Sequence, residues 1–399
     1  MNRIFILSLS LLQLISWGSV FYGFALFVAP IETELGIVRV QSSLGFSLAL
    51  LMEGLFAYAV GRLIDRGHER FVMTSGSTLL GVGLLFLGTV NSLAGYLVAW
   101  TILGVGLAGT LYSPVFAVVI RRFPYEFRSA IITMTFLGGL ASTAFIPLIS
   151  FMINEMGWRN TAQFLGFLNF IICAPAHFAL LKNAPESVAI KGDLEPKKSS
   201  LNRSKSDFEL LIKSPTFLYL CVFNVLLMAV TAAVPAHMIN LLREAGLAPW
   251  LVIAVPAGVG LLQVVGRLGL YFLENRIDSH FTNRWSPALI PIGILALLTG
   301  YGEPAWAVVF VFAFGLGNGM LTIVRGTSVA QYLGTEYVGS LNGLIGFPVA
   351  LARAASPLLL GALWTKEYGY VSGLYFLLAI SILGVLAIRL AQSYSKQKA

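Results

Sequence analysis

The amino-acid sequence predicts an all-α membrane protein with twelve transmembrane helices in two six-helix bundles. Apolar residue types make up 57% of the 399 residues, and charged types only 11%. A soluble domain carries about 25% charged residues, so this chain lacks the polar surface that water requires. The apolar residues also gather in runs of about twenty, the length that crosses a bilayer as a helix.

The runs are separated by charged or turn-rich breaks, and each run predicts one span. The first, from Ile4 to Ile31, is uncharged and too long for a signal-peptide core, so we expect a retained helix. A membrane β-barrel would instead show alternation over about ten residues. The predicted spans are about 4–31, 40–61, 71–90, 94–120, 129–153, 160–181, 215–239, 247–271, 285–301, 305–328, 338–364 and 369–388.

One long polar stretch, 183–214, divides the chain into an N-terminal bundle (1–182) and a C-terminal bundle (215–399), and we interpret it as a cytoplasmic linker. Twelve spans place both termini on one side of the membrane. That side receives 19 of the 26 Lys and Arg residues, and the opposite side receives four. The positive-inside rule therefore predicts cytoplasmic termini, and we expect a bacterial inner (plasma) membrane. The four residues on the opposite side are Arg39, Arg159, Arg243 and Lys366.

The two halves of the sequence resemble each other. Val-Gly-Arg-Leu at 60–63 recurs at 265–268, Gly104 and Gly106 correspond to Gly315 and Gly317, and Pro147 corresponds to Pro357. These offsets of 205 to 211 residues pair each span with the sixth span after it. Parallel repeats of this kind are typical of alternating-access transporters, whose substrate binds between the halves.

The stretch 61–70, Gly-Arg-Leu-Ile-Asp-Arg-Gly-His-Glu-Arg, is similar to the loop 2–3 motif of the major facilitator superfamily. The resemblance covers nearly the whole chain. It implies that Gly61, Asp65, Arg66 and Arg70 form a charge latch that holds one conformational state, with Arg267 as its counterpart in the second half. A basic loop that merely fixes topology is the alternative.

Within that superfamily, Arg121-Arg122, Arg128-Ser129-Ala130 and Gly138-Gly139 resemble the monocarboxylate transporter group and its bacterial relatives. Arg267 stands where those carriers hold a functional Arg. Their acidic residue one turn earlier is Gln263 here, and the first span has no Lys. The proton relay of the animal carriers is therefore incomplete in this chain.

Charged residues inside the membrane are functional candidates, because each costs at least about 2.5–3.5 kcal/mol to insert. Glu53 is the acidic residue that falls well inside a span, and burial favours its protonated form, as a proton carrier requires. Arg353, near the midplane, and Arg325 suit an anionic substrate. Each of these arginines has an alternative role as a structural partner of Glu53.

Other polar residues at similar depth are candidates for the substrate cavity, although such residues are more often part of the helix packing. They are Tyr22, Tyr112, Asn224, Asn318 and Asn342. His237 matches a position where bacterial relatives carry His, and it is a second candidate for proton coupling. The membrane glycines more often allow close helix contact than substrate contact.

We therefore predict a secondary active transporter that couples protons to a small organic anion such as a monocarboxylate. An efflux carrier for amphipathic compounds is the alternative, and pairing of Arg353 with protein would favour it. A channel or scramblase fits the repeat less well. No metal cluster, Walker loop or catalytic triad is present in the sequence, so we expect no enzyme and no cofactor. The expected partners are the substrate, the proton and the bilayer, without nucleic acid, and the expected state is a monomer.

Overall fold

Within the residues that the structure describes, 3–123, 127–182, 209–273, 278–334 and 338–396, the regular elements of this computed structural model are all helices. The sole extended pairing in those ranges is one bridge between Thr365 and Gly369. In chain order the elements are α1 (Arg3–Ser16), the π-helix η1 (Trp17–Tyr22), α2 (Gly23–Leu35), α3 (Arg39–Asp65), α4 (Glu69–Leu87), α5 (Leu93–Thr110), α6 (Tyr112–Arg122), α7 (Phe127–Gly139), α8 (Ala141–Phe167), η2 (Leu168–Cys173), α9 (Ala174–Leu180), α11 (Pro215–Glu244), α12 (Pro249–Leu273), α13 (Ser279–Trp285), η3 (Ser286–Ala288), α14 (Leu289–Thr299), α15 (Pro304–Leu333), α16 (Val338–Ala362) and α17 (Val371–Lys396).

The observed helices confirm the all-α membrane fold. Ten helical segments of the described chain are long and apolar enough to cross a membrane. One of them, Thr133–Leu180, has 48 residues and contains two predicted spans, which are separated by a backbone break at Gly157 (φ 78°, ψ 164°). The predicted ninth span is divided among α13, η3 and α14, and α14 has only 11 residues. With this division and α14 included, the helices match the twelve predicted spans.

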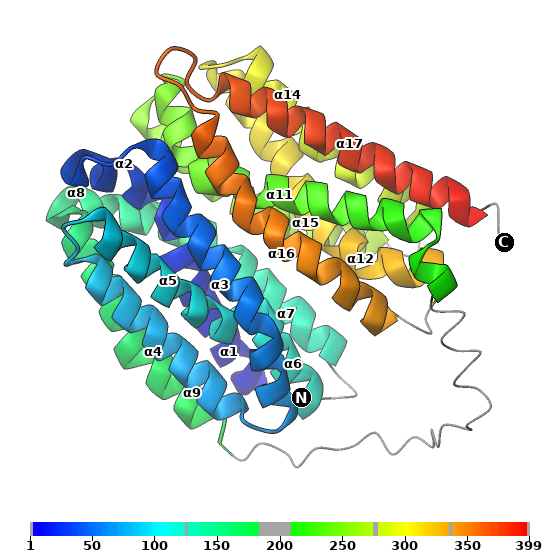
Figure 1. The fold of residues 1–399 in the computed structure, drawn as a ribbon, viewed down its shortest axis with the longest axis horizontal. Helices are drawn as coiled ribbons and strands as arrows, with labels where there is room; N and C mark the ends of the chain where they lie inside the picture. Colours follow the sequence, from blue (N-terminus) through cyan, green and yellow to red (C-terminus); the bar gives the residue numbers. More distant parts are fainter. Residues whose placement is uncertain (1–2, 124–126, 183–208, 274–277, 335–337, 397–399) are drawn as a thin grey trace.

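Figure 1 shows the helices in two groups, α1–α9 and α11–α17, with both chain ends at the same end of the molecule. We call that end the termini side and the opposite end the far side. The groups meet mainly where α3 packs on α16, α8 and α7 on α12, and α2 on α11. Most of the predicted linker lies outside the described residues, and Ser214 then caps α11 by accepting a hydrogen bond from the Phe217 N–H.

The glycines that mark the sequence repeat occupy matching places in the packing. A Cβ on Gly104 would lie 2.5 Å from the Ala49 carbonyl of α3, and a Cβ on Gly315 would lie 2.7 Å from Leu262 of α12. Helix α5 therefore approaches α3 as closely as α15 approaches α12, six spans later. The prediction that these glycines permit close helix contact is confirmed for this pair.

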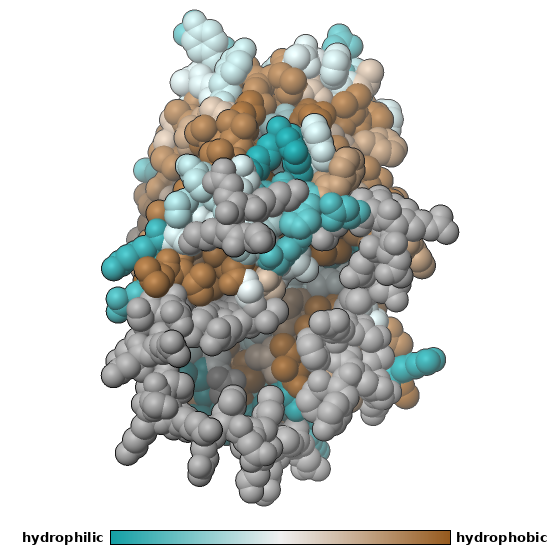
Figure 2. Space-filling view, turned by 90° about the vertical axis from the view of Figure 1, so that its right-hand side faces the viewer, coloured by the Kyte–Doolittle hydropathy of each residue, from teal (hydrophilic) through white to brown (hydrophobic). Residues whose placement is uncertain are grey.

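The two groups are in contact on the far side and separate toward the termini side. A Cβ on Gly54 of α3 would lie 2.8 Å from Ala350 of α16, and a Cβ on Gly361 would lie closer still to Ser43. Beyond Gly54, residues 55–59 of α3 are all exposed, and a Cβ on Gly343 or Gly346 of α16 would meet no atom within 4 Å. Figure 2, which faces the side with the carboxyl terminus, shows a recess between the groups.

Candidate functional site

Glu53 of α3 and Arg353 of α16 form an ion pair between the two groups of helices. Arg353 donates from Nη1 to Oε1 and from Nη2 to Oε2 of Glu53, and both bonds are 3.3 Å long. The two side chains are 15% and 20% exposed, respectively, so the pair is largely removed from solvent. We call these two residues the central pair. Such a paired, two-pronged geometry is the arrangement that a guanidinium prefers with a carboxylate.

Arg325 of α15 lies beside the central pair and interacts electrostatically with both of its members. Its one polar contact among the described residues is from Nη1 to the sulfur of Met228, at 3.5 Å. Its side chain is exposed to solvent although α15 lies within the bundle. Two guanidinium groups therefore lie near one carboxylate, which pairs with Arg353 alone, and this part of the interface carries a net positive charge.

Arg267 of α12 forms a second centre together with Tyr22 and Tyr112. The Tyr112 hydroxyl contacts the Arg267 guanidinium. The Tyr22 hydroxyl contacts Gln263 and interacts electrostatically with Arg267. Arg267 also donates from Nη1 to the Thr135 carbonyl of α7, at 2.5 Å. We call Arg267, Gln263, Tyr22 and Tyr112 the arginine–tyrosine cluster. It joins the two groups of helices near the termini side.

Irregular backbone positions the two tyrosines of this cluster. Tyr22 ends the π-helix η1, and Tyr112 follows the break between α5 and α6, at which Leu111 is extended (φ −74°, ψ −165°). Trp17 of η1 packs its ring 5.0 Å from that of Tyr112. The Trp17 indole N–H is buried there without a hydrogen-bond partner. Short π-helical segments are frequent at functional sites, and unpaired buried donors invite a polar ligand.

The three predicted asparagines lie in different environments. Asn318 of α15 is half-buried, seven residues before Arg325 and hence on the same helix face. Asn342 of α16 is exposed, on the termini side of Arg353. Asn224 of α11 is buried and donates to the Leu220 carbonyl of its own helix, at 2.8 Å. Asn318 thus shares a helix face with Arg325, whereas Asn224 is used within its own helix.

The loop 2–3 residues contact the first group of helices. Arg70 donates to the Phe178 carbonyl at 2.8 Å, Arg66 is exposed, and a Cβ on Gly61 would meet nothing within 4 Å. The side chain of Asp65 lies outside the described part of the chain. Because the groups are separated on this side, the predicted latch has no described contact with the second group.

His237 of α11 is fully buried and contacts neither member of the central pair. Its Nε2 is 2.9 Å from the Pro357 carbonyl, and its Nδ1 is 2.9 Å from the Tyr370 hydroxyl. Since a carbonyl only accepts, Nε2 carries the proton, and Nδ1 accepts from Tyr370. The observed geometry is therefore that of a neutral imidazole.

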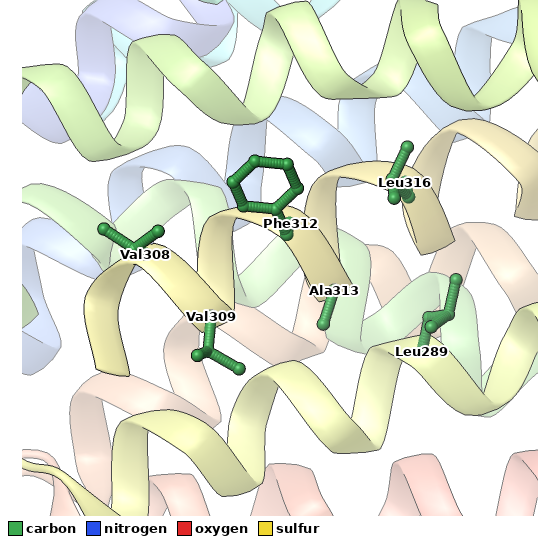
Figure 3. Close-up of a pocket in the computed structure, with 6 residues that line it drawn as sticks. All are labelled: Leu289, Val308, Val309, Phe312, Ala313 and Leu316. Carbon is green, nitrogen blue, oxygen red and sulfur yellow. The ribbon is translucent and has the colours of Figure 1, made fainter. Parts of the chain in front are cut away.

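An apolar groove of about 380 Å³ lies between α14 and α15, and none of these charged residues lines it. Figure 3 shows the apolar side chains that line it. It lacks the polar groups that orient a small ligand, and it is not a candidate for the transport site. Within the described residues, no three His, Cys, Asp or Glu residues gather where they could hold a metal ion.

The family model of the Major Facilitator Superfamily matches residues 7–357. The chain is 23% identical to the uncharacterized MFS-type transporter YcxA of Bacillus subtilis (strain 168), over 99% of this chain and 96% of that protein. It is 25% identical to monocarboxylate transporter 13 of Bos taurus, covering 82% of this chain and 76% of that one.

An MFS-type efflux pump of Mycolicibacterium smegmatis (strain ATCC 700084 / mc(2)155) is 26% identical, over 77% of this chain and 66% of the pump. Among solved structures, the crystal structure of the nucleoside transporter NupG superposes with a TM-score of 0.73 at 14% identity, covering 98% of this chain and 99% of that one. At this identity, the superposition supports the shared fold.

Proposed function

Because this chain belongs to the Major Facilitator Superfamily, which makes it a membrane transporter, we propose that it moves a small organic anion, such as a monocarboxylate, together with a proton. The observation that carries this proposal is the excess of guanidinium groups at the interface. Arg353 is neutralised by Glu53, whereas Arg325 and Arg267 have no carboxylate partner among the described residues. An anion supplies the missing negative charge.

The central pair suggests how the proton and the anion are coupled. In the empty carrier, Glu53 and Arg353 neutralise each other, so this pair adds no unpaired charge to that of Arg325 when the halves rearrange. A proton on Glu53 releases Arg353, which then binds the carboxylate of the substrate. A proton without the anion leaves Arg353 unpaired in addition to Arg325, and this penalty opposes movement of the carrier with a proton alone. An anion without the proton must compete with Glu53 for Arg353.

The arginine–tyrosine cluster provides a second polar region on the path. Arg267 presents its guanidinium to the Tyr112 hydroxyl and interacts electrostatically with that of Tyr22, and the buried Trp17 indole lies beside the Tyr112 ring. The bovine relative, named as a monocarboxylate transporter, is in keeping with a carboxylate ligand. We propose that Tyr22, Tyr112 and Asn318 line the substrate cavity, with Asn342 at its opening.

The remaining assignments belong to the same proposal. The chain would divide into bundles 1–182 and 215–399, joined by the linker 183–214, with both termini in the cytoplasm of a bacterial cell. Gly61, Asp65, Arg66 and Arg70 would engage the second bundle when the termini side closes. His237 is a second protonation site, distinct from Glu53.

An efflux carrier for amphipathic compounds is the second candidate. It is favoured by the pairing of Arg353 with protein and by the aromatic rings of Trp17, Tyr22 and Tyr112 around the interface. The name of the mycobacterial relative points the same way. The unpaired Arg325 favours the anion, because a positively charged guanidinium repels the cationic amphiphiles that such carriers commonly remove.

Liposomes that contain purified protein and a pH-sensitive dye separate the two candidates. We expect internal acidification when one or a few small carboxylates are added outside, and loss of that signal in Glu53→Gln and Arg353→Gln. Glu155→Gln and Arg284→Gln, at exposed positions outside the interface, are the matched controls. If no carboxylate acidifies the interior, the anion proposal fails and amphipathic substrates are tested instead.

A further inference from the structure

Arg39, at the first turn of α3 on the far side, binds both groups of helices. Its Nε donates to Glu32 of α2, at 2.7 Å to Oε1 and 3.0 Å to Oε2, within the first group. Its Nη1 donates to Glu244 of α11, at 3.0 Å, and to the Tyr370 hydroxyl, both in the second group. The side chain is only 9% exposed. One guanidinium thus ties two carboxylates from different halves.

The second group surrounds this guanidinium with further contacts. The Trp364 indole N–H donates to the other oxygen of Glu244, at 2.7 Å. The Arg39 guanidinium carbon also lies 5.0 Å from the Trp364 ring centroid and 5.5 Å from that of Tyr370. Glu244 is therefore held in place by its own half, and Arg39 binds a site that is already formed.

A directed chain of hydrogen bonds continues from Arg39 into the membrane. Tyr370 accepts from Arg39 and donates to His237, which in turn donates to the Pro357 carbonyl of α16. The titratable and charged groups that face His237 along this chain are Tyr370 and Arg39, beyond which lie Glu32 and Glu244.

We propose that Arg39, Glu32, Glu244, Trp364, Tyr370 and His237 form the far-side gate of this transporter, with the Arg39–Glu244 bridge as the contact that must break for the far side to open. The gate closes the side on which the two groups touch, while they are separated on the termini side. None of its residues belongs to the central pair or the arginine–tyrosine cluster. The gate shares His237 with the proposed proton coupling, but it goes beyond the proposed substrate and requires only alternating access.

Cysteine labelling in nanodiscs, which expose both faces of the protein, tests the gate. The chain has two cysteines, Cys173 and Cys221, and both are replaced by Ala. Ser47→Cys is the reporter. Ser47 lies on α3, eight residues after Arg39 and toward the interior of the membrane, and is only 6% exposed, so a reagent reaches it only when the far side opens. Into this background are placed Arg39→Gln, Glu244→Gln and the matched control Arg159→Gln. Arg159 pairs with Glu34 at 2.7 Å, also on the far side but within the first group.

We expect a water-soluble maleimide to label the reporter roughly tenfold faster in Arg39→Gln and Glu244→Gln than in the control, because each variant breaks a partly buried bridge between the halves. A second reporter, Tyr58→Cys at a 74% exposed position of the same helix, distinguishes opening from general loosening. When the far side opens, the termini side closes, so labelling of Tyr58→Cys becomes slower. General loosening of the structure does not slow it. Equal labelling of Ser47→Cys in all three variants, or faster labelling at both reporters, overturns the proposal. Neither outcome depends on the substrate.

Discussion

The central pair makes a quantitative prediction about stability. Glu53→Gln leaves Arg353 and Arg325 side by side without a carboxylate, whereas Arg353→Gln leaves Glu53 beside Arg325, which can still neutralise it. Removing one partner of a buried ion pair costs about 3–5 kcal/mol. We expect about 3 kcal/mol for Glu53→Gln, since the pair is 15–20% exposed, and about half that cost for Arg353→Gln.

The assay is a double-mutant cycle on the free energy of unfolding, measured by equilibrium denaturation in detergent micelles. The double variant Glu53→Gln/Arg353→Gln retains only Arg325 as an unpaired charge, so its cost should fall below the sum of the single costs by about 1–3 kcal/mol. An interaction energy within about 0.5 kcal/mol of zero would refute the pair as an energetic contact. Equal costs for the two single variants would refute the role given to Arg325.

Three further predictions concern the helix contacts, the second centre and the far side. Gly319→Ala should destabilise the protein by about 1–3 kcal/mol, because its Cβ would collide with the Gln263 carbonyl, whereas Gly326→Ala, in open space on the same helix, should be neutral or stabilising by up to about 1 kcal/mol in thermal unfolding. Arg267→Lys keeps the charge but loses the planar fork, so the KM for the transported anion should rise about tenfold, and an unchanged KM would place the substrate elsewhere. The neutral geometry of His237 predicts that protonation opens the far side, so labelling of the Ser47→Cys reporter should rise as pH falls, and it should lose this pH dependence in His237→Gln.

The twelve spans were predictable because long apolar runs have few alternatives to a membrane helix, and because charged loops separate them. The sequence does not reveal that the ninth span would be interrupted by η3 or that Tyr22 would end a π-helix. Both depend on tertiary contacts rather than on local composition. The boundary at Gly157 was predictable in outline, because Gly157 lies between two predicted spans and allows the positive φ found there.

The candidate site was predictable residue by residue but not pair by pair. The sequence singles out Glu53, Arg353 and Arg325 because charges inside the membrane are costly, yet it leaves open whether they bind substrate or one another. Their pairing depends on how α3 meets α16, with 300 residues between the partners. The far-side role of Arg39 escaped the sequence analysis, since at the end of a span it counted only toward topology.

The glycine contacts also determine where this protein can deform. Helices α5 and α3 are interlocked through Gly104, and α15 and α12 through Gly315, without room for one to slide along the other. Each of these pairs therefore moves as one unit, and the rearrangement falls on the contacts between the two groups, α3 with α16 and α7 with α12, although Gly54 and Gly361 also pack closely across the first of them. Glu53 and Arg353 lie at the first of these contacts and Arg267 at the second. Every transport cycle therefore rearranges the contacts of Glu53, Arg353 and Arg267 between the two groups.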